Sequence, residues 1–391
     1  MSSDLSQAAL VPRLRPFTST VFAEMTSLAN QHSAVNLGQG FPDTDGPPAM
    51  LEAASEALFD GANQYPPGPG REDLRNAIAG HRARYGLDYD PDNEILVTAG
   101  ATEAIAASLL ALTESGDEII VIEPYYDSYV AAVALAGATR RVVALTTDED
   151  GRFALDVEAV RAAITPTTKA IIVNSPHNPT GTVFTKPELR ALAAVCVEHD
   201  LLAITDEVYE HLTFGAEHTP LASFEGMRDR TVSISSAGKT FNCTGWKIGW
   251  VCSPPELLAA VRAAKQFMTF VSGGPLQPAV GYALDNELNW VHGLRDQLAG
   301  KRQKLTEGLA NAGFTVRPSA GTYFVCVDVR PLGFTDATEL AWQLPERAGV
   351  AAVPVGVFTD NPGDWQHLLR FAFCKRDEVL DEAVTRLAAF G

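Results

Sequence analysis

The sequence predicts an α/β fold in which helices cover both faces of a mostly parallel central sheet, with a smaller α+β unit beside it. The main observation is that apolar runs of strand length alternate with stretches of helical period between residues 94 and 235. Such alternation is typical of parallel sheets whose strands are joined by helices. A second observation is the length of 391 residues, which exceeds that of an average domain. The third is a change after residue 254 from alternation to long helical stretches.

The segment before the alternating region combines helices with rigid turns. Residues 21–30 predict a helix because Phe22, Met25 and Leu28 fall on one side of it. The prolines and glycines of residues 63–70 exclude both a helix and a central strand there. Further elements are expected as follows: helices at 47–60 and 72–85, and a brief strand at 35–37.

The rest of the chain follows the same rules of period. Strands are expected at 94–97, 118–122, 141–145, 170–174, 202–205 and 231–235, and helices at 103–112, 128–136, 157–164 and 186–199. Later elements are expected as helix over most of 254–312, strands at 322–329 and 367–374, and a closing helix at 377–389. We therefore expect a large domain over residues 46–285. Residues 1–45 and 286–391 together would form a small domain.

Composition and charge narrow the class of protein. The chain is 46% hydrophobic and carries a formal net charge of −18, which argues against nucleic acid and anionic membranes as partners. Its apolar segments are too short to span a bilayer, and its first residues show no signal-peptide pattern. The five cysteines have no CxxC spacing, so we expect neither a disulfide framework nor a metal site. These observations predict a cytoplasmic protein.

A lysine that follows the strand expected at 231–235 is the first candidate for chemistry. Lys239 stands among small residues in Ser236-Ala237-Gly238-Lys239-Thr240, and Lys247 follows further along. Small neighbours let a bulky ligand approach the backbone. A partly desolvated lysine has a lowered pKa and can act as a nucleophile. Taken alone, Lys239 is better interpreted as a solvated surface residue. Whether it is a catalytic candidate therefore depends on the residues at the other strand ends.

Two further strand ends offer groups that can bind an anion or donate hydrogen bonds. Gly100, Ala101 and Thr102 lie between a strand and a helix, where free N–H groups and the helix dipole can hold a phosphate. A plain capped turn is the simpler alternative at this place. Asn178 lies in the loop Ser175-Pro176-His177-Asn178-Pro179-Thr180-Gly181, whose prolines and glycine hold it rigidly.

Two more strand ends carry an acid and aromatic residues. Asp206 follows an apolar strand, and Tyr209 comes shortly after it. A buried carboxylate is costly unless it meets a positive partner, which a protonated pyridine nitrogen would provide. Asp206 could equally cap the next helix. Tyr126 can stack on a flat ring or fill the core.

Together these residues match one cofactor. A phosphate cradle, a carboxylate, an amide, a phenol, a stacking ring and an amine are what pyridoxal 5'-phosphate requires. The motifs Asn178-Pro179-Thr180-Gly181, Thr205-Asp206-Glu207-Val208-Tyr209 and Ser236-Ala237-Gly238-Lys239 resemble those of fold-type I, class I aminotransferases, over nearly the whole chain. The resemblance implies an enzyme of that fold. It also implies a large domain that binds the cofactor, and a homodimer with shared active sites.

The resemblance implies a role for each matched residue. Lys239 would attach covalently to the cofactor and later transfer the substrate proton. Asp206 would pair with the pyridine nitrogen, while Asn178 and Tyr209 would bind the phenolic oxygen of the ring. Tyr126 would stack on the ring. The phosphate would be held by Gly100, Ala101, Thr102, Ser236 and Lys247, with Tyr65 reaching in from a second subunit.

One arginine is expected to bind the substrate. Arg370 lies within an otherwise apolar run, and a buried guanidinium without an anion is costly. The resemblance implies that Arg370 binds the substrate α-carboxylate together with Asn178 and the backbone at Gly40. An internal salt bridge is the alternative. Phe22 would form part of the pocket wall.

Further motifs resemble the kynurenine/methionine branch of the family. Leu37-Gly38-Gln39-Gly40-Phe41-Pro42-Asp43 and Gly245-Trp246-Lys247-Ile248-Gly249-Trp250 carry this resemblance. Within the branch, residues 63–70, 236–250 and 270–278 most resemble actinobacterial N-succinyldiaminopimelate aminotransferases. Ser272-Gly273 stands where kynurenine-type enzymes tend to place an aromatic residue and a histidine. Small residues there would leave room for a long acyl side chain.

The resulting hypothesis is a ping-pong transfer of an amino group between an amino acid and 2-oxoglutarate. The expected donor is N-succinyl-LL-2,6-diaminopimelate, in lysine biosynthesis. A kynurenine, methionine or glutamine aminotransferase and a cysteine-S-conjugate β-lyase remain open on the same scaffold. A cofactor-binding regulator would need a DNA-binding domain, for which the chain has neither room nor basic charge. An NAD-dependent dehydrogenase is disfavoured because no strand is followed by GxGxxG.

Overall fold

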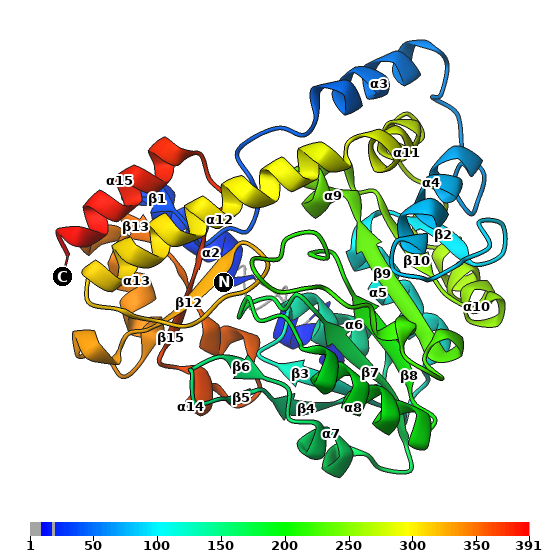
Figure 1. The fold of residues 1–391 in the computed structure, drawn as a ribbon. Coiled ribbons are helices and arrows are strands. Elements are labelled where there is room, and N and C mark those ends of the chain that lie inside the picture. Colours follow the sequence, from blue (N-terminus) through cyan, green and yellow to red (C-terminus); the bar gives the residue numbers. More distant parts are fainter. Residues whose placement is uncertain (1–8, 18–19, 391) are drawn as a thin grey trace.

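The computed structural model describes residues 9–17 and 20–390, and its central feature is a seven-stranded sheet (Figure 1). In spatial order its strands are β2 (Ile95–Thr98), β10 (Gly249–Cys252), β9 (Thr231–Ser236), β8 (Leu202–Asp206), β7 (Thr168–Asn174), β3 (Glu118–Glu123) and β4 (Thr139–Ala144). Only β10 runs antiparallel to its neighbours. The mostly parallel α/β sheet expected from the sequence is thereby confirmed.

Helices cover both faces of this sheet, because alternate residues of each strand point to opposite sides. On one face, Ile119 and Val121 pack with helices α5 (Gly100–Leu112), α6 (Asp127–Ala136) and α10 (Pro255–Lys265). On the other face, Ile120 and Ile122 pack with α7 (Val157–Ala163) and α8 (Lys186–Glu198). Burial on both sides explains why the strands are continuous apolar runs.

The remaining elements beside the large sheet are helices at its β2 edge and short connecting pieces. Three helices share a core with β2 and β10: α3 (Pro48–Phe59), α4 (Glu72–Ala83) and α11 (Leu276–Asn286). The short pieces are α9 (Ala237–Thr240), the hairpin β5 (Thr146–Thr147) and β6 (Phe153–Ala154), and the 3-10 helices η1 (Pro12–Phe17), η2 (Leu221–Ser223), η3 (Arg228–Arg230) and η4 (Thr244–Trp246).

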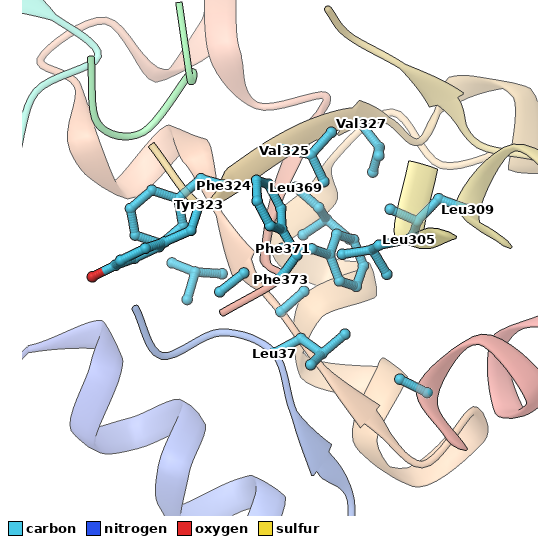
Figure 2. Close-up of a cluster of buried hydrophobic side chains, with 14 of the residues drawn as sticks. Leu37, Leu305, Leu309, Tyr323, Phe324, Val325, Val327, Leu369, Phe371 and Phe373 are labelled. Atoms are coloured by element: carbon cyan, nitrogen blue, oxygen red, sulfur yellow. The ribbon is translucent and has the colours of Figure 1, made fainter. Parts of the chain in front are cut away.

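A long helix, α12 (Leu288–Asn311), leads from α11 to a second, smaller sheet (Figure 1). The strand order in that sheet is β11 (Thr315–Val316), β12 (Phe324–Asp328), β15 (Leu368–Ala372) and β14 (Val353–Pro354). Its companions are η5 (Arg330–Leu332), α13 (Ala337–Arg347), η6 (Val355–Phe358), α14 (Pro362–Trp365) and α15 (Asp377–Ala388). Its apolar core contains Leu305 and Leu309 of α12 and Phe371 of β15 (Figure 2).

The part of the N-terminal segment from α2 to β1 belongs spatially to this smaller unit, whereas η1 packs against α6 beside the large sheet. Strand β1 (Val35–Asn36) pairs in parallel with β13 (Val350–Ala351), and α2 (Val21–Gln31) packs beside it. Leu37 reaches the same apolar cluster (Figure 2). Chain ends that are far apart in the sequence therefore build one core.

Three expectations about the elements were wrong or incomplete. Strand β10 was not expected, because four residues that follow a turn carry too little periodic signal. Helix α13 was missed since it contains Pro345, a residue that normally breaks a helix. Helix α5 begins at Gly100 rather than at residue 103. That earlier start brings the helix N-terminus to the edge of the sheet.

Two general features concern the whole described chain. Over residues 9–17 and 20–390, no helix combines the length and apolar character needed to cross a membrane. All five cysteines are buried and free.

Candidate active site

A cavity of about 350 Å³ lies where the carboxyl ends of the central strands meet the smaller unit. Ends of β7, β8 and β9 and the start of α5 contribute one side, and residues of the N-terminal segment, β12 and β15 contribute the other. The predicted site residues that line it are Phe22, Gly40, Gly100, Ala101, Thr102, Tyr126, Asn178, Asp206, Tyr209, Ser236, Lys239, Lys247 and Arg370. The structure therefore brings together every predicted site residue except Tyr65.

Lys239 extends into this cavity from the short helix α9, directly after β9. Its Nζ donates a hydrogen bond to the carbonyl of Gly40 at 3.2 Å. Burial lowers the pKa of this amine from 10.5 to about 8. Arg370 and Lys247 lower the pKa further, whereas Asp206 acts in the opposite direction. A larger share of the amine is therefore neutral and nucleophilic near neutral pH than for an exposed lysine.

Asp206 ends strand β8 and is almost completely buried. Its Oδ2 accepts a hydrogen bond from the Tyr129 hydroxyl at 2.7 Å, and its Oδ1 accepts one from the Val208 N–H at 3.3 Å. Within the described part of the chain, no ion pair holds this carboxylate. Burial raises its pKa above the ordinary value of 3.8, and the hydrogen bond from Tyr129 opposes that rise. Asp206 is thus a buried acid that lacks a fixed cation.

The N-terminus of α5 and the β9–β10 connection form an anion cradle. A Cβ atom at Gly249 would lie 2.6 Å from the carbonyl carbon of Gly100, so only glycine lets the two segments approach this closely. Lys247 has a left-handed backbone with a φ of 54°. Its Nζ would lie 3.1 Å from a Cβ placed on Gly100. The amine therefore lies close to the helix N-terminus. The positive charge of the amine and the positive end of the helix dipole both favour an anion there.

Arg370 is fully buried in β15 and has no acidic partner among the residues that the structure describes. It donates one hydrogen bond to Oδ1 of Asn178 and one to the carbonyl of Gly38, both at 2.9 Å. Its Nε is buried without a partner. The side chain of Phe324 lies 4.0 Å below the guanidinium. The alternative of an internal salt bridge is therefore wrong, and Arg370 remains free to bind an anion in the cavity.

Tyr65 lies outside the cavity of its own chain. Its side chain is 81% exposed and packs edge-on against Phe270 with 5.4 Å between the ring centroids. Both residues belong to neighbouring loops that also contain Ser272 and Gly273. The expected contact of Tyr65 with the site of a second subunit stays a prediction.

Sequence reasoning missed three residues close to the reactive groups. Tyr129 bonds Asp206, and the signal that could have found it is its position one helical turn after Tyr126. Asn174 donates to the carbonyl of Asp206 at 2.9 Å and accepts from the N–H of Asn178 at 2.7 Å. Tyr323 contacts the loop that binds Lys239, and no local pattern indicates this contact.

Comparisons with known proteins agree with this geometry. The family model "Aminotransferase class I and II" matches residues 32–387. The chain belongs to this family. It is therefore an aminotransferase, as the sequence motifs indicated.

Relatives within the family include enzymes with different substrates. A solved structure of N-succinyldiaminopimelate aminotransferase from Mycobacterium tuberculosis is 58% identical, has a TM-score of 0.96, and is matched over 98% of this chain and 100% of that chain. The methionine aminotransferase of Escherichia coli is 38% identical over 97% of this chain and 98% of its own length. Kynurenine–oxoglutarate transaminase 3 of Mus musculus is 36% identical over 95% of this chain and 88% of its own length.

Proposed function

We propose that this aminotransferase uses pyridoxal 5'-phosphate to transfer an amino group between an amino acid and 2-oxoglutarate. One observation carries the proposal most directly. The lysine amine with the lowered pKa and the buried acid without a cation, Lys239 and Asp206, line the same cavity. An amine that can condense with an aldehyde and an acid that needs a cation are complementary to this cofactor.

The residues present fit the cofactor. The cradle at Gly100 combines the N–H groups at the start of α5 with the Lys247 amine, whose Nζ would lie 3.1 Å from a Cβ placed on Gly100, and this combination suits a phosphate. Asp206 has room for a hydrogen bond from a protonated ring nitrogen, because each carboxylate oxygen has two lone pairs and the bonds from Tyr129 and the Val208 N–H occupy one on each. Tyr126 lines the same cavity and can stack on a planar ring.

When bound, the cofactor supplies an aldehyde that condenses with amines and a ring that draws electron density from the substrate Cα. The Lys239 amine would hold the cofactor by a covalent bond and, when free, would accept the proton from the substrate Cα. Asp206 would keep the ring nitrogen protonated, and Asn178 and Tyr209 would donate to the ring oxygen and so orient the ring.

The substrate carboxylate has a binding group ready. The Nε of Arg370 is unpartnered, and its other nitrogens are held by Asn178 and Gly38, so the guanidinium is oriented before the substrate arrives.

We propose N-succinyl-LL-2,6-diaminopimelate as the donor. The support is the 58% identity to the M. tuberculosis enzyme. Ser272 and Gly273 lie beside Tyr65 outside the cavity of their own chain, so the room they leave for an acyl chain depends on the expected second subunit. Among the described residues, the cations that line the cavity are Lys239, Lys247 and Arg370.

A homodimer with shared sites is part of the proposal. Four aromatic side chains are exposed on or next to the two loops that contain Tyr65 and Phe270. Their exposed fractions are 89% for Phe59, 81% for Tyr65, 86% for Phe267 and 49% for Phe270. Exposed apolar groups of this kind mark interaction surfaces. We expect a second copy to cover them and Tyr65 to enter the partner's cavity. Sedimentation at micromolar concentration should give the mass of a dimer.

Domain division and location complete the proposal. Residues 46–285 contain all strands of the large sheet, while β1 joins the C-terminal elements, which supports a small domain made of the segment from α2 to residue 45 together with 286–391. Of the rest of the proposed 1–45, η1 packs against α6, and residues 1–8 lie outside the described residues. A cytoplasmic location fits five free cysteines, since free thiols persist in a reducing compartment.

A donor screen tests the proposed reaction. N-succinyl-LL-2,6-diaminopimelate, methionine and kynurenine are each offered with 2-oxoglutarate, and we expect the highest kcat/KM for the succinylated donor. Lys239→Ala should lower turnover by at least about 10³-fold because the general base is lost. Lys186→Ala is the matched control, since that lysine is exposed and pairs with Glu217 at 2.9 Å. Full activity of Lys239→Ala would refute the mechanism, and release of pyruvate and ammonia instead of amino transfer would indicate a β-lyase.

A further inference from the structure

The carbonyl of Gly40 accepts hydrogen bonds from two side chains in the candidate active site. The Tyr323 hydroxyl donates to it at 2.6 Å, and the Lys239 amine donates to it at 3.2 Å. A carbonyl oxygen has two lone pairs, so each donor can occupy one. The amine also lies 5.5 Å from the centre of the Tyr323 ring. Tyr323 and Lys239 thus share one acceptor.

Tyr323 itself is held firmly. It is 1% exposed, and its ring packs at right angles against that of Tyr209, with 5.3 Å between centroids. Its backbone carbonyl accepts from the N–H of Phe373 at 2.9 Å. Figure 2 shows its hydroxyl directed away from the apolar cluster that surrounds Phe324 and Phe371. A buried hydroxyl that leaves the apolar core has its position set by its hydrogen bonds.

The residue before Tyr323 adopts an unfavourable backbone conformation. Thr322 has a φ of 65°, a left-handed value that is an outlier for a β-branched residue. Its N–H donates to the carbonyl of Leu212 at 2.8 Å, and its hydroxyl accepts from the N–H of Phe324 at 3.0 Å. Such strain persists only where the surroundings enforce it, and it is concentrated at functional sites. The strained turn gives Tyr323 its direction toward Gly40.

We propose that Tyr323 is a positioning residue for Lys239. Its hydroxyl fixes the carbonyl of Gly40, and this carbonyl holds the lysine amine in place whenever the amine is not covalently engaged. The inference rests on the proposed function, because it assigns to the free amine a task in covalent attachment and in proton transfer. Without the hydroxyl the amine keeps its chemistry but loses its fixed resting place.

The test compares covalent and non-covalent binding of the cofactor to the full-length apoenzyme. In the covalent step the Lys239 nitrogen adds to the aldehyde carbon of pyridoxal 5'-phosphate and one water leaves, which changes the absorbance. The analogue 4'-deoxypyridoxine 5'-phosphate has no aldehyde and reports binding alone. For Tyr323→Phe we expect attachment about ten-fold slower, the effect of one well-placed hydrogen bond, and unchanged affinity for the analogue.

Tyr125→Phe is the matched control. Tyr125 is also buried, and its hydroxyl donates to Asp360 at 2.6 Å, away from the residues that line the cavity. Both variants lose one tyrosine hydroxyl hydrogen bond and should lose similar thermal stability. Only Tyr323→Phe should attach the cofactor slowly and lose kcat, while its KM for the amino donor stays unchanged because Arg370 and Asn178 are intact.

The outcomes separate this inference from the proposed function. Attachment by Tyr323→Phe at the wild-type rate, with a loss of stability like that of Tyr125→Phe, would overturn the positioning role and leave the aminotransferase mechanism intact. Weaker binding of the analogue would also overturn it, since the hydroxyl would then shape the cofactor pocket itself. If the wild-type apoenzyme forms no covalent adduct, the proposed function fails instead.

Discussion

Residues 206–210 contain three buried carboxylates, and the fold gives a cation to two of them but not to the third. Asp206 faces the cavity without a cation, whereas Glu207 and Glu210 face away from it and share the guanidinium of Arg82. The distances from Arg82 to these two glutamates are 2.9 Å and 3.4 Å. Burial by itself raises the pKa of all three acids. Arg82 and nearby histidines nevertheless hold the pKa of both glutamates below the ordinary range. The pKa of Asp206 is raised.

The difference teaches how to distinguish a structural charge from a functional one. Glu207 also accepts from Thr205 at 2.8 Å, and Glu210 accepts from Ser235 at 2.7 Å, so each has a hydrogen-bond donor as well as the Arg82 cation within the protein. A buried charge that is paired within the fold stabilises a conformation. An acid such as Asp206, which the fold leaves without a cation, is ready for a ligand that brings one.

The largest expected effect comes from changing the unpaired acid. Asp206→Asn should lower kcat/KM by about 10³-fold, because one preorganised electrostatic contact to the reacting system is lost. The stability of the apoenzyme should not fall, since a neutral amide is less costly to bury than a carboxylate. Steady-state kinetics and urea unfolding measure the two effects. A loss of stability as large as that expected for Arg82 would show that Asp206 is structural.

A smaller effect, on folding rather than chemistry, is expected on the other side of the segment. Arg82→Met leaves two buried glutamates without their cation and should lower the free energy of unfolding by about 3–5 kcal/mol. Urea unfolding of the apoenzyme measures this change. Combining it with Glu207→Gln and Glu210→Gln should restore part of the loss, because no uncompensated charge remains. An unchanged unfolding midpoint in the single variant would contradict the pairing.

The smallest effect concerns pH. The lowered pKa values of Glu207 and Glu210 give stability that is present above their ordinary pKa of 4.5 and lost as the pH falls. The raised pKa of Asp206 has the opposite sign, since its contribution is present below its ordinary pKa of 3.8 and lost as the pH rises. The stability gained by Asp206→Asn should therefore grow from about pH 4 upward and then level off. A gain independent of pH would mean that Asp206 is not perturbed.

Much of the site could be predicted because its residues follow strand ends. Lys239, Asp206 and Asn178 each lie within four residues of the end of an apolar run, and parallel topology brings such positions to one edge of the sheet. No single position was sufficient, but the set of strand ends and the family motifs together identified them. The pairing of Arg82 with Glu207 could not be found in this way, because it joins α4 to a loop more than a hundred residues later. Neither local sequence indicates the other as its partner.

The parts that were missed depend on tertiary packing. Strand β10 is short and antiparallel, and it lies between β2 and β9. Its position depends on pairing with these two strands, and the pattern of apolar residues within its own four positions does not indicate it. Tyr323 precedes an ordinary apolar strand, and its role depends on the strained backbone of Thr322. Such features become visible only when distant segments are in contact.

The most direct measurement locates the lysine that carries the cofactor. The protein is incubated with pyridoxal 5'-phosphate, reduced with borohydride, digested, and its modified peptide identified by mass spectrometry. We expect the label on Lys239, and its loss in Lys239→Ala with no label gained elsewhere. A label on Lys247, on a surface lysine or on none would contradict the assignment of Lys239, which lines the same cavity as Asp206, as the reactive group.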